Sequence, residues 1–230
     1  MTVREWSSYE PDFEMKNDFD VVLFDNDGVL VDSEPLFLQA TQELLSTVGV
    51  TVNAELYAEI CLRRGASVFE LAVARGLSTS EIRELRARRD ERYGELIDEG
   101  VRVFDGVRAA LARMHRVRPM AIVTSSGRDH FERIHHQTDL VRFFEFVLTD
   151  GDYARHKPHP DPYLMAAERF GVRPERCLVV EDTERGLAAA HAAGMRCVVI
   201  PNQLSESGNF ERAERVLSSM KELAPLLGPA

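Results

Sequence analysis

Short runs of bulky apolar residues recur along the chain, and segments with helical periodicity separate them. The runs are VVLF (21–24), MAIV (120–123), FEFVL (144–148), CLVV (177–180) and CVVI (197–200). Runs that are apolar on both faces are typical of strands buried in a parallel sheet, and their alternation with helices indicates βαβ units. The pattern therefore predicts a doubly wound α/β fold with a mostly parallel, Rossmann-like sheet.

The sequence also marks the ends of several intervening helices. Asp161 is a candidate N-cap, with Pro162 in the first turn and Gly171 at the exit. Thr183 can cap the start of a second helix, which Gly194 can close. An amphipathic helix is expected over 107–115, and the adjacent histidines at 135 and 136 are expected on a helix surface.

Residues 34–101 differ from the rest of the chain, because they contain helical stretches and no convincing buried strand. Ser78 and Glu81 have the spacing of a capping box, which opens a highly charged helix with a solvated face. We therefore predict a helical cap domain over 34–101, inserted into an α/β core domain formed by 19–33 and 102–230. Residues 1–18 are expected to be a flexible lead.

Composition and charge narrow the function classes. The 230 residues are 44% hydrophobic, yet no run reaches the roughly 20 apolar residues of a membrane helix, and the polar N-terminus lacks an apolar signal core. The net charge of −10, with dispersed arginines, argues against a nucleic-acid partner. Three cysteines without a CxxC pair, two of them in apolar runs (Cys177 and Cys197), suit a reducing compartment. We expect a cytoplasmic monomer or weak dimer that binds no membrane.

Polar side chains follow four of the apolar runs, at the points where the predicted strands end. They are Asp25 and Asp27; Thr124, Ser125 and Ser126; Asp150 and, later, Lys157; and Glu181 and Asp182. One such group is weak evidence, because Asp is a common turn former. Ligands of open α/β sheets bind beyond the carboxyl ends of the strands, so four groups at four strand ends indicate one shared site.

The residue types suit one chemistry. The four acids Asp25, Asp27, Glu181 and Asp182 offer hard oxygen ligands without Cys or His, which favours Mg²⁺ over Zn²⁺. Lys157 adds a positive charge, and Thr124 supplies a hydroxyl. The loop and helix start that follow it (SSGRDHF) can offer backbone N–H groups to an anion. Together these groups point to phosphoryl transfer to a carboxylate.

At this point the chain resembles a known family. DNDGVLVDS (25–33), the T of IVTSS, the K of HKPHPDPY and the ED of VVEDTERG resemble the four motifs of the haloacid dehalogenase superfamily, in order between about residues 20 and 201. The insert after the first motif resembles the helical cap of the branch that holds β-phosphoglucomutase and many sugar-phosphate phosphatases.

The resemblance implies a role for each motif position. Asp25 would be the nucleophile that becomes an aspartyl phosphate, and Asp27 would serve as general acid and then as general base. Mg²⁺ would be held by the side chain of Asp25, the backbone carbonyl of Asp27, and the acids Glu181 and Asp182. The phosphoryl oxygens would be bound by Thr124, Ser125, Ser126 and Lys157.

Departures from the family patterns narrow the reaction. Asp27 disfavours dehalogenation, because dehalogenases lack this second acid. Phe37 and Val68 stand where β-phosphoglucomutase has a cap histidine and a cap arginine. The sequence therefore predicts a Mg²⁺-dependent phosphatase for a small phosphorylated metabolite, a sugar or sugar-acid phosphate. A phosphomutase is the alternative, and a non-catalytic phosphometabolite-binding protein is the third possibility.

Several polar residues keep two interpretations. Asp32 and Ser33 are expected to end the turn into the first cap helix, with substrate contact as the alternative. The cap arginines at 63 and 64 are solvated by default, although a sugar or acid group could pair with them. The histidines at 156 and 159 are read as loop residues rather than metal ligands. Asn26, between the two key acids, has no assigned role.

Overall fold

The computed structural model describes residues 18–226, and this part of the chain forms a single sheet of six strands. The strands are β1 (Val21–Phe24), β2 (Met120–Gly127), β3 (Phe146–Asp150), β4 (Cys177–Glu181), β5 (Arg196–Val199) and β6 (Arg215–Val216). Their order is β3-β2-β1-β4-β5-β6, and every neighbouring pair is parallel. The predicted doubly wound α/β fold is therefore confirmed.

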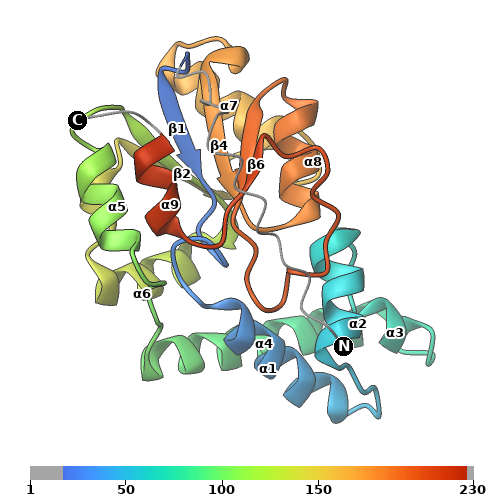
Figure 1. The fold of residues 1–230 in the computed structure, drawn as a ribbon. Helices are drawn as coiled ribbons and strands as arrows, with labels where there is room; N and C mark the ends of the chain where they lie inside the picture. The colour runs from blue at the N-terminus through green and yellow to red at the C-terminus, as the bar shows by residue number, and fades with distance from the viewer. Residues whose placement is uncertain (1–17, 227–230) are drawn as a thin grey trace.

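Helices cover both faces of this sheet (Figure 1). One face is packed by α5 (Val107–Met114), α6 (Arg128–Thr138) and α9 (Met220–Leu226), and the other by α7 (Asp161–Phe170) and α8 (Glu184–Ala192). Single turns of 3₁₀ helix lie at Val141–Phe143 (η2) and Pro174–Arg176 (η3). Alternate residues of β1 point to opposite faces, since Val22 and Phe24 join one core cluster and Val21 and Leu23 the other.

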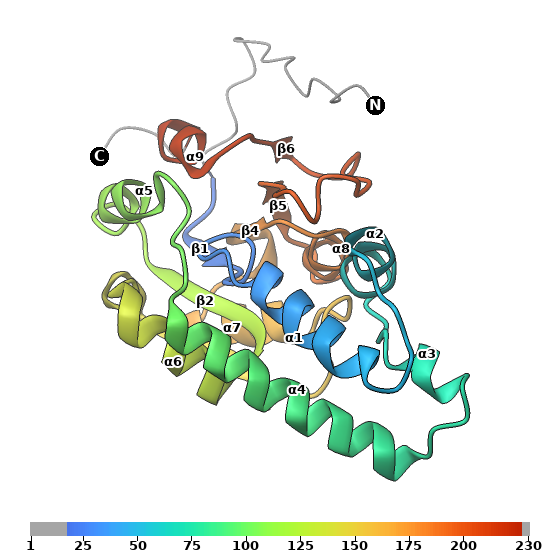
Figure 2. The same ribbon diagram turned by 90° about the horizontal axis from the view of Figure 1, so that it is seen from below.

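The remaining helices form the cap, which lies beyond the arrowhead of β1 (Figures 1 and 2). They are α1 (Glu34–Ser46), α2 (Ala54–Tyr57), the π-helical turn η1 (Ala58–Arg63), α3 (Glu70–Val73) and α4 (Thr79–Glu99). These helices share a third apolar cluster that includes Leu45, Leu62 and Phe69. The chain enters and leaves the cap side by side, where Val31 and Val103 form an isolated antiparallel bridge.

Some local predictions are confirmed. Ser78 and Glu81 form the predicted capping box of α4, and the side chain of Thr183 accepts the N–H of Gly186 at the start of α8. Gly171 ends α7 with a left-handed φ of 68°, which glycine adopts without steric cost. Cys177 and Cys197 are buried free thiols. Within residues 18–226, no helix combines the length and apolar character needed to cross a membrane.

Other local predictions are wrong by a few residues. Asp161 is the first residue of α7 rather than its cap, and its carboxylate pairs with Arg155 at 2.8 Å instead. The run 144–148 enters the sheet only from Phe146, because the residues just before it form the turn η2. The predicted lead of residues 1–18 lies outside the described residues, apart from its last position.

Candidate active site

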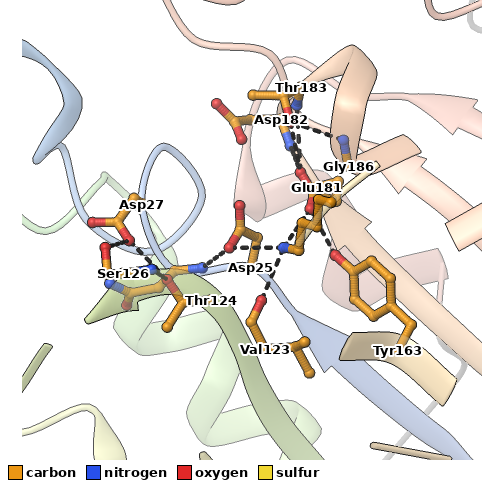
Figure 3. Close-up of polar contacts among 12 residues, drawn as sticks. Asp25, Asp27, Val123, Thr124, Ser126, Tyr163, Glu181, Asp182, Thr183 and Gly186 are labelled. Atoms are coloured by element: carbon orange, nitrogen blue, oxygen red, sulfur yellow. Dashed lines mark hydrogen bonds and ion pairs between the residues drawn. The ribbon is translucent and has the colours of Figure 1, made fainter. Parts of the chain in front are cut away.

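The predicted site lies where the direction of strand order reverses. β1 and β4 are neighbours in the sheet, although the chain visits β2 and β3 between them. Asp25 directly follows β1, Glu181 is the last residue of β4, and Asp182 comes next. The carboxyl ends of the two strands therefore bring three acids together, in the crevice where open α/β sheets bind ligands (Figure 3).

Lys157 is buried among these acids. Its Nζ lies 3.1 Å from Oδ1 of Asp25 and donates to Oε1 of Glu181 at 2.7 Å and to the carbonyl of Val123 at 2.9 Å. Lys157 is only 3% exposed, so these three oxygens replace its hydration. The lysine comes from the loop between β3 and α7, and its contacts join that loop to β2 and β4.

Glu181 is the most completely satisfied of the acids. Its Oε1 also accepts the hydroxyl of Tyr163 at 2.6 Å, and its Oε2 accepts the hydroxyl of Thr183 at 3.2 Å and the N–H of Asp182 at 3.2 Å. Gly186 packs against the carboxylate from the first turn of α8, where a Cβ atom would lie 1.9 Å from Cδ of Glu181. The site therefore requires glycine at that position.

The cluster carries more negative than positive charge. Burial raises the pKa of Asp25 to about 7, aided by the charge of Glu181 and opposed by Lys157. Burial, with Glu181 and Asp25, also raises the pKa of Asp182 well above its usual value. For Glu181, burial acts to raise the pKa, but Lys157 and the hydrogen bonds outweigh it, so the pKa is lowered. A cation between these acids would relieve their repulsion.

The donor set fits a hard divalent cation. Ligand oxygens of Asp25, Glu181 and Asp182 all lie within 4.8 Å of one another. Oδ1 of Asp182 is buried and has no hydrogen-bond partner among the described residues, while Oδ2 accepts from the side chain of Asn202 at 2.7 Å. An all-oxygen set with a free carboxylate oxygen is what Mg²⁺ binds, and Mg²⁺ there would neutralise charge on a transferring phosphoryl group.

The side chain of Asp27 lies apart from this acid group and is held by hydroxyls. Its Oδ2 accepts from Thr124 at 2.9 Å and from Ser126 at 2.7 Å, and its Oδ1 accepts from Ser33. Thr124 and Ser126 belong to the end of β2, so the predicted phosphate-binding segment and the predicted general acid are in direct contact (Figure 3). The cluster of Asp25, Glu181 and Asp182 is formed by side-chain oxygens. Binding of Mg²⁺ by the backbone carbonyl of Asp27 therefore stays a prediction.

These groups open into a cavity of about 920 Å³ between the core and the cap. Asp25, Asp27, Thr124 and Asp182 line it from the core, and Phe37 and Val68 are among the cap residues that face it. Ser125 and Asp150 also line it. The site is thus enclosed on one side by strand ends and on the other by helices, as a pocket for a small molecule requires.

Other polar residues singled out from the sequence have protein partners. Arg63 pairs with Glu184 of α8 at 2.8 Å, and Arg64 pairs with Glu59 at 2.5 Å. Arg102 pairs with Asp32 at the cap hinge. The histidine at 156 lies 3.6 Å from Asp150 on the surface.

The prediction that His135 lies on a helix surface is wrong. It is 8% exposed and packs against Phe131, with ring centroids 4.3 Å apart. Buried residues of α6 recur at Phe131, Ile134, His135 and Thr138, which is the spacing of one helix face. That spacing is the signal that places His135 inside.

Sequence reasoning missed three side chains that hold the acids. Tyr163 binds Glu181, Ser33 binds Asp27, and Asn202 binds Asp182. Tyr163 ends the stretch quoted for the third motif, where only Lys157 has an assigned role, and Asn202 stands in no quoted motif, so only the fold shows that both reach the site. Ser33 lies in the quoted first motif, where the sequence predicts the end of a turn, and its hydroxyl also donates to Asp27.

Comparisons with known proteins define the class. The model of the haloacid dehalogenase-like hydrolase family matches residues 22–200. The chain therefore belongs to this family, as its resemblance to the four motifs predicts, and the structure has the α/β core and helical cap expected of it.

Individual relatives are phosphatases. The chain is 30% identical to a probable pseudouridine-5'-phosphatase of Drosophila melanogaster, over 88% of this chain and 90% of the relative. It is 29% identical to the phosphoglycolate phosphatase of Escherichia coli (strain K12), over 90% and 92%. Among solved structures, CbbY of Rhodobacter sphaeroides in complex with phosphate is 27% identical, with a TM-score of 0.76 over 89% of this chain and 96% of the other. The prediction of a phosphoric monoester hydrolase of this family is thus confirmed.

Proposed function

We propose that the protein hydrolyses a small phosphorylated metabolite, a sugar or sugar-acid phosphate, with Mg²⁺ and through an aspartyl phosphate on Asp25. The observation that carries the proposal is the buried contact of Lys157 with Asp25 beside Glu181 and Asp182. Lys157 offers its charge to the nucleophile and to the incoming phosphoryl oxygens, while the three acids form the Mg²⁺ site. The proposal gives these groups the roles that the family resemblance implies: Asp27 is the general acid and base, and Glu181 and Asp182 bind Mg²⁺ with Asp25.

The proposed reaction has two steps. In the first, a carboxylate oxygen of Asp25 forms a bond to phosphorus, the ester P–O bond breaks, and Asp27 gives its proton to the leaving oxygen. In the second, water attacks phosphorus and loses its proton to Asp27, which releases inorganic phosphate and restores Asp25. Asp27 accepts one hydroxyl at Oδ1 and two at Oδ2, which leaves a lone-pair site on Oδ1 for the proton that it transfers.

The end of β2 supports phosphate binding. Thr124 and Ser126 reach Asp27 through their hydroxyls, and Ser125 lines the cavity between them. The N-terminus of α6, which begins at Arg128, follows at once. Backbone N–H groups at a helix start favour an anion, so the phosphoryl oxygens would lie between this segment and Lys157.

Arg185 supports a substrate with a second acidic group. It lines the cavity, and it makes no hydrogen bond or ion pair with residues 18–226; its Nε is buried without an acceptor. The charges of Glu34 and Asp25 attract this guanidinium without a direct hydrogen bond. A carboxylate or phosphate on the alcohol portion of the substrate would give it a bidentate partner. Phosphoglycolate, named for the E. coli relative, carries such a carboxylate.

The experiment is a phosphate-release screen over phosphorylated sugars, sugar acids, polyols and nucleotides with Mg²⁺. Asp25→Asn should fold and release no phosphate. Asp27→Asn should slow both steps, and with a substrate whose leaving group needs no proton it should accumulate phosphoenzyme, detectable by intact mass. Asp105→Asn, the same change at an exposed position, is the matched control. Near wild-type turnover by Asp25→Asn would refute the nucleophile.

Product analysis separates the alternatives. An isomerised sugar phosphate without phosphate release would establish the mutase, and no turnover of any compound would favour a binding protein. The cytoplasmic location, the monomeric or weakly dimeric state and the absence of nucleic-acid and membrane partners stay predictions.

A further inference from the structure

Asn26 lies between the proposed nucleophile and the proposed acid, and it is fully buried. Its backbone already fixes the turn: its N–H donates to Oδ1 of Asp25 at 2.8 Å, and its carbonyl accepts N–H groups of Val29, Leu30 and Val31. These backbone bonds do not depend on the side chain. The side chain must therefore be explained by its own contacts.

The Asn26 side chain is hydrogen-bonded to helix α6. Oδ1 of Asn26 lies 2.8 Å from Nε2 of His135, and Nδ1 of that ring lies 2.7 Å from Oγ1 of Thr138. Because an amide oxygen only accepts, Nε2 carries the proton and Nδ1 accepts the hydroxyl. Burial lowers the pKa of His135 to about 4, so the ring is neutral at neutral pH, as this chain of bonds requires.

This chain of bonds is a poor device for stability. Nδ2 of Asn26 is buried without a hydrogen-bond partner in the described part of the protein. The ring of His135 packs against Phe131, which belongs to the main core cluster. A well-packed apolar pair would satisfy such surroundings without leaving a donor unpaired. A hydrogen bond is directional, so the polar pair fixes the orientation of the turn that contains Asn26 relative to α6.

We propose that Asn26 and His135 are positioning residues, which hold the segment from Asp25 to Asp27 in register with the phosphate-binding end of β2. α6 begins directly after β2, so its buried hydrogen bond ties the turn to the same rigid element that follows Thr124 and Ser126. The inference rests on the proposed function. Loss of the bond leaves both acids present but lets their orientation drift, and misplacement on the scale of 1 Å can cost roughly 100-fold in rate.

The test uses wild type and five variants: His135→Phe, His135→Gln, Asn26→Leu, the double variant Asn26→Leu/His135→Phe, and the control His136→Phe. Turnover of p-nitrophenyl phosphate and thermal unfolding are measured for each. We expect His135→Phe to lower kcat about tenfold with KM within about twofold, because orientation rather than binding is lost. His135→Gln, whose amide can donate in place of Nε2, should recover much of kcat. His136→Phe, the same change at the exposed neighbouring histidine, should change neither quantity.

The double variant separates positioning from stability. Removing both partners leaves neither the amide nor the imidazole unpaired, and the hydroxyl of Thr138 can turn to a carbonyl of its own helix, so Tm should return toward that of wild type while kcat stays low. Recovery of kcat together with Tm, or a kcat in His135→Phe equal to wild type well below Tm, would overturn the positioning role. A wild-type protein that releases no phosphate from any phosphomonoester would instead refute the proposed function, and this inference with it.

Discussion

Replacing Gly186 by alanine tests the packing of the acid cluster with one methyl group. The Cβ atom would lie 1.9 Å from Cδ of Glu181 and 2.1 Å from each of its carboxylate oxygens. Gly186 belongs to the first turn of α8, and its N–H is bound to Thr183 at 3.1 Å, so the helix cannot easily withdraw. The carboxylate of Glu181 must therefore move.

The cost follows from what Glu181 would lose. Displacement breaks its buried pair with Lys157 at 2.7 Å and its bond from Tyr163 at 2.6 Å. Breaking a buried ion pair costs roughly 3–5 kcal/mol, and the better helix propensity of alanine returns about 1 kcal/mol. A net loss of about 2–4 kcal/mol corresponds to a Tm lower by roughly 4–16 °C for a protein of this size. Mg²⁺ affinity should fall at least tenfold or so, because a ligand is displaced.

Gly94→Ala is the matched control, since Gly94 also lies inside a helix. Its Cβ would meet the guanidinium of Arg133, with Nη1 at 2.7 Å, which is the end of a half-exposed side chain that can swing away. We expect unchanged or slightly higher stability, by up to about 1 kcal/mol. Thermal unfolding with and without Mg²⁺, and calorimetric Mg²⁺ titration, measure both effects. A Gly186→Ala protein with the Tm and Mg²⁺ affinity of wild type would refute the packing argument.

Three further predictions concern charge. Mg²⁺ at about 100 times its Kd should stabilise the protein by about 2.7 kcal/mol, and EDTA should remove this gain and all turnover; a Tm that ignores Mg²⁺ would contradict the metal site. His135 binds its proton more weakly in the folded protein, so wild type should lose about 3 kcal/mol relative to His135→Phe as the pH falls from about 6.5 to about 4, measured by urea unfolding at several pH values. Parallel curves would show that His135 titrates normally. Arg185→Met should lower kcat/KM at least about tenfold for phosphoglycolate but little for ethyl phosphate; equal losses would exclude an acid-specific contact.

The sequence alone predicts the sheet and the convergence of the acids for a simple physical reason. Apolar runs that end abruptly in carboxylates mark strand ends, and parallel strands place those ends at one edge. Asp25, Glu181 and Lys157 meet there, as the pattern predicts. The short strand β6 and helix α9 were not predicted, because two strand residues and a helix containing Pro225 give little periodic signal.

Contacts between distant elements were harder to predict. Tyr163 reads as one more apolar position of an amphipathic helix, and only the packing of α7 on β1 and β2 brings its hydroxyl to Glu181. The polarity of histidine predicts an exposed position for His135, although it lies on the apolar stripe of its helix. Tertiary packing therefore decides what a polar residue does on a buried face, and local preference does not.

Helix α6 limits how far the cap can be treated as an exchangeable module. Its outer residues are bound to cap helix α4: Nε2 of His130 lies 3.0 Å from the carbonyl of Asp90, and Gln137 donates to the carbonyl of Ile97 at 2.8 Å. The opposite face of α6 reaches Asn26 through His135. A chimera that exchanges the cap at its two connecting segments would thus pair the cap of one relative with an α6 helix of another, and these cap–α6 contacts would not match. Recombination between such enzymes should preserve activity best when α6 travels with the cap.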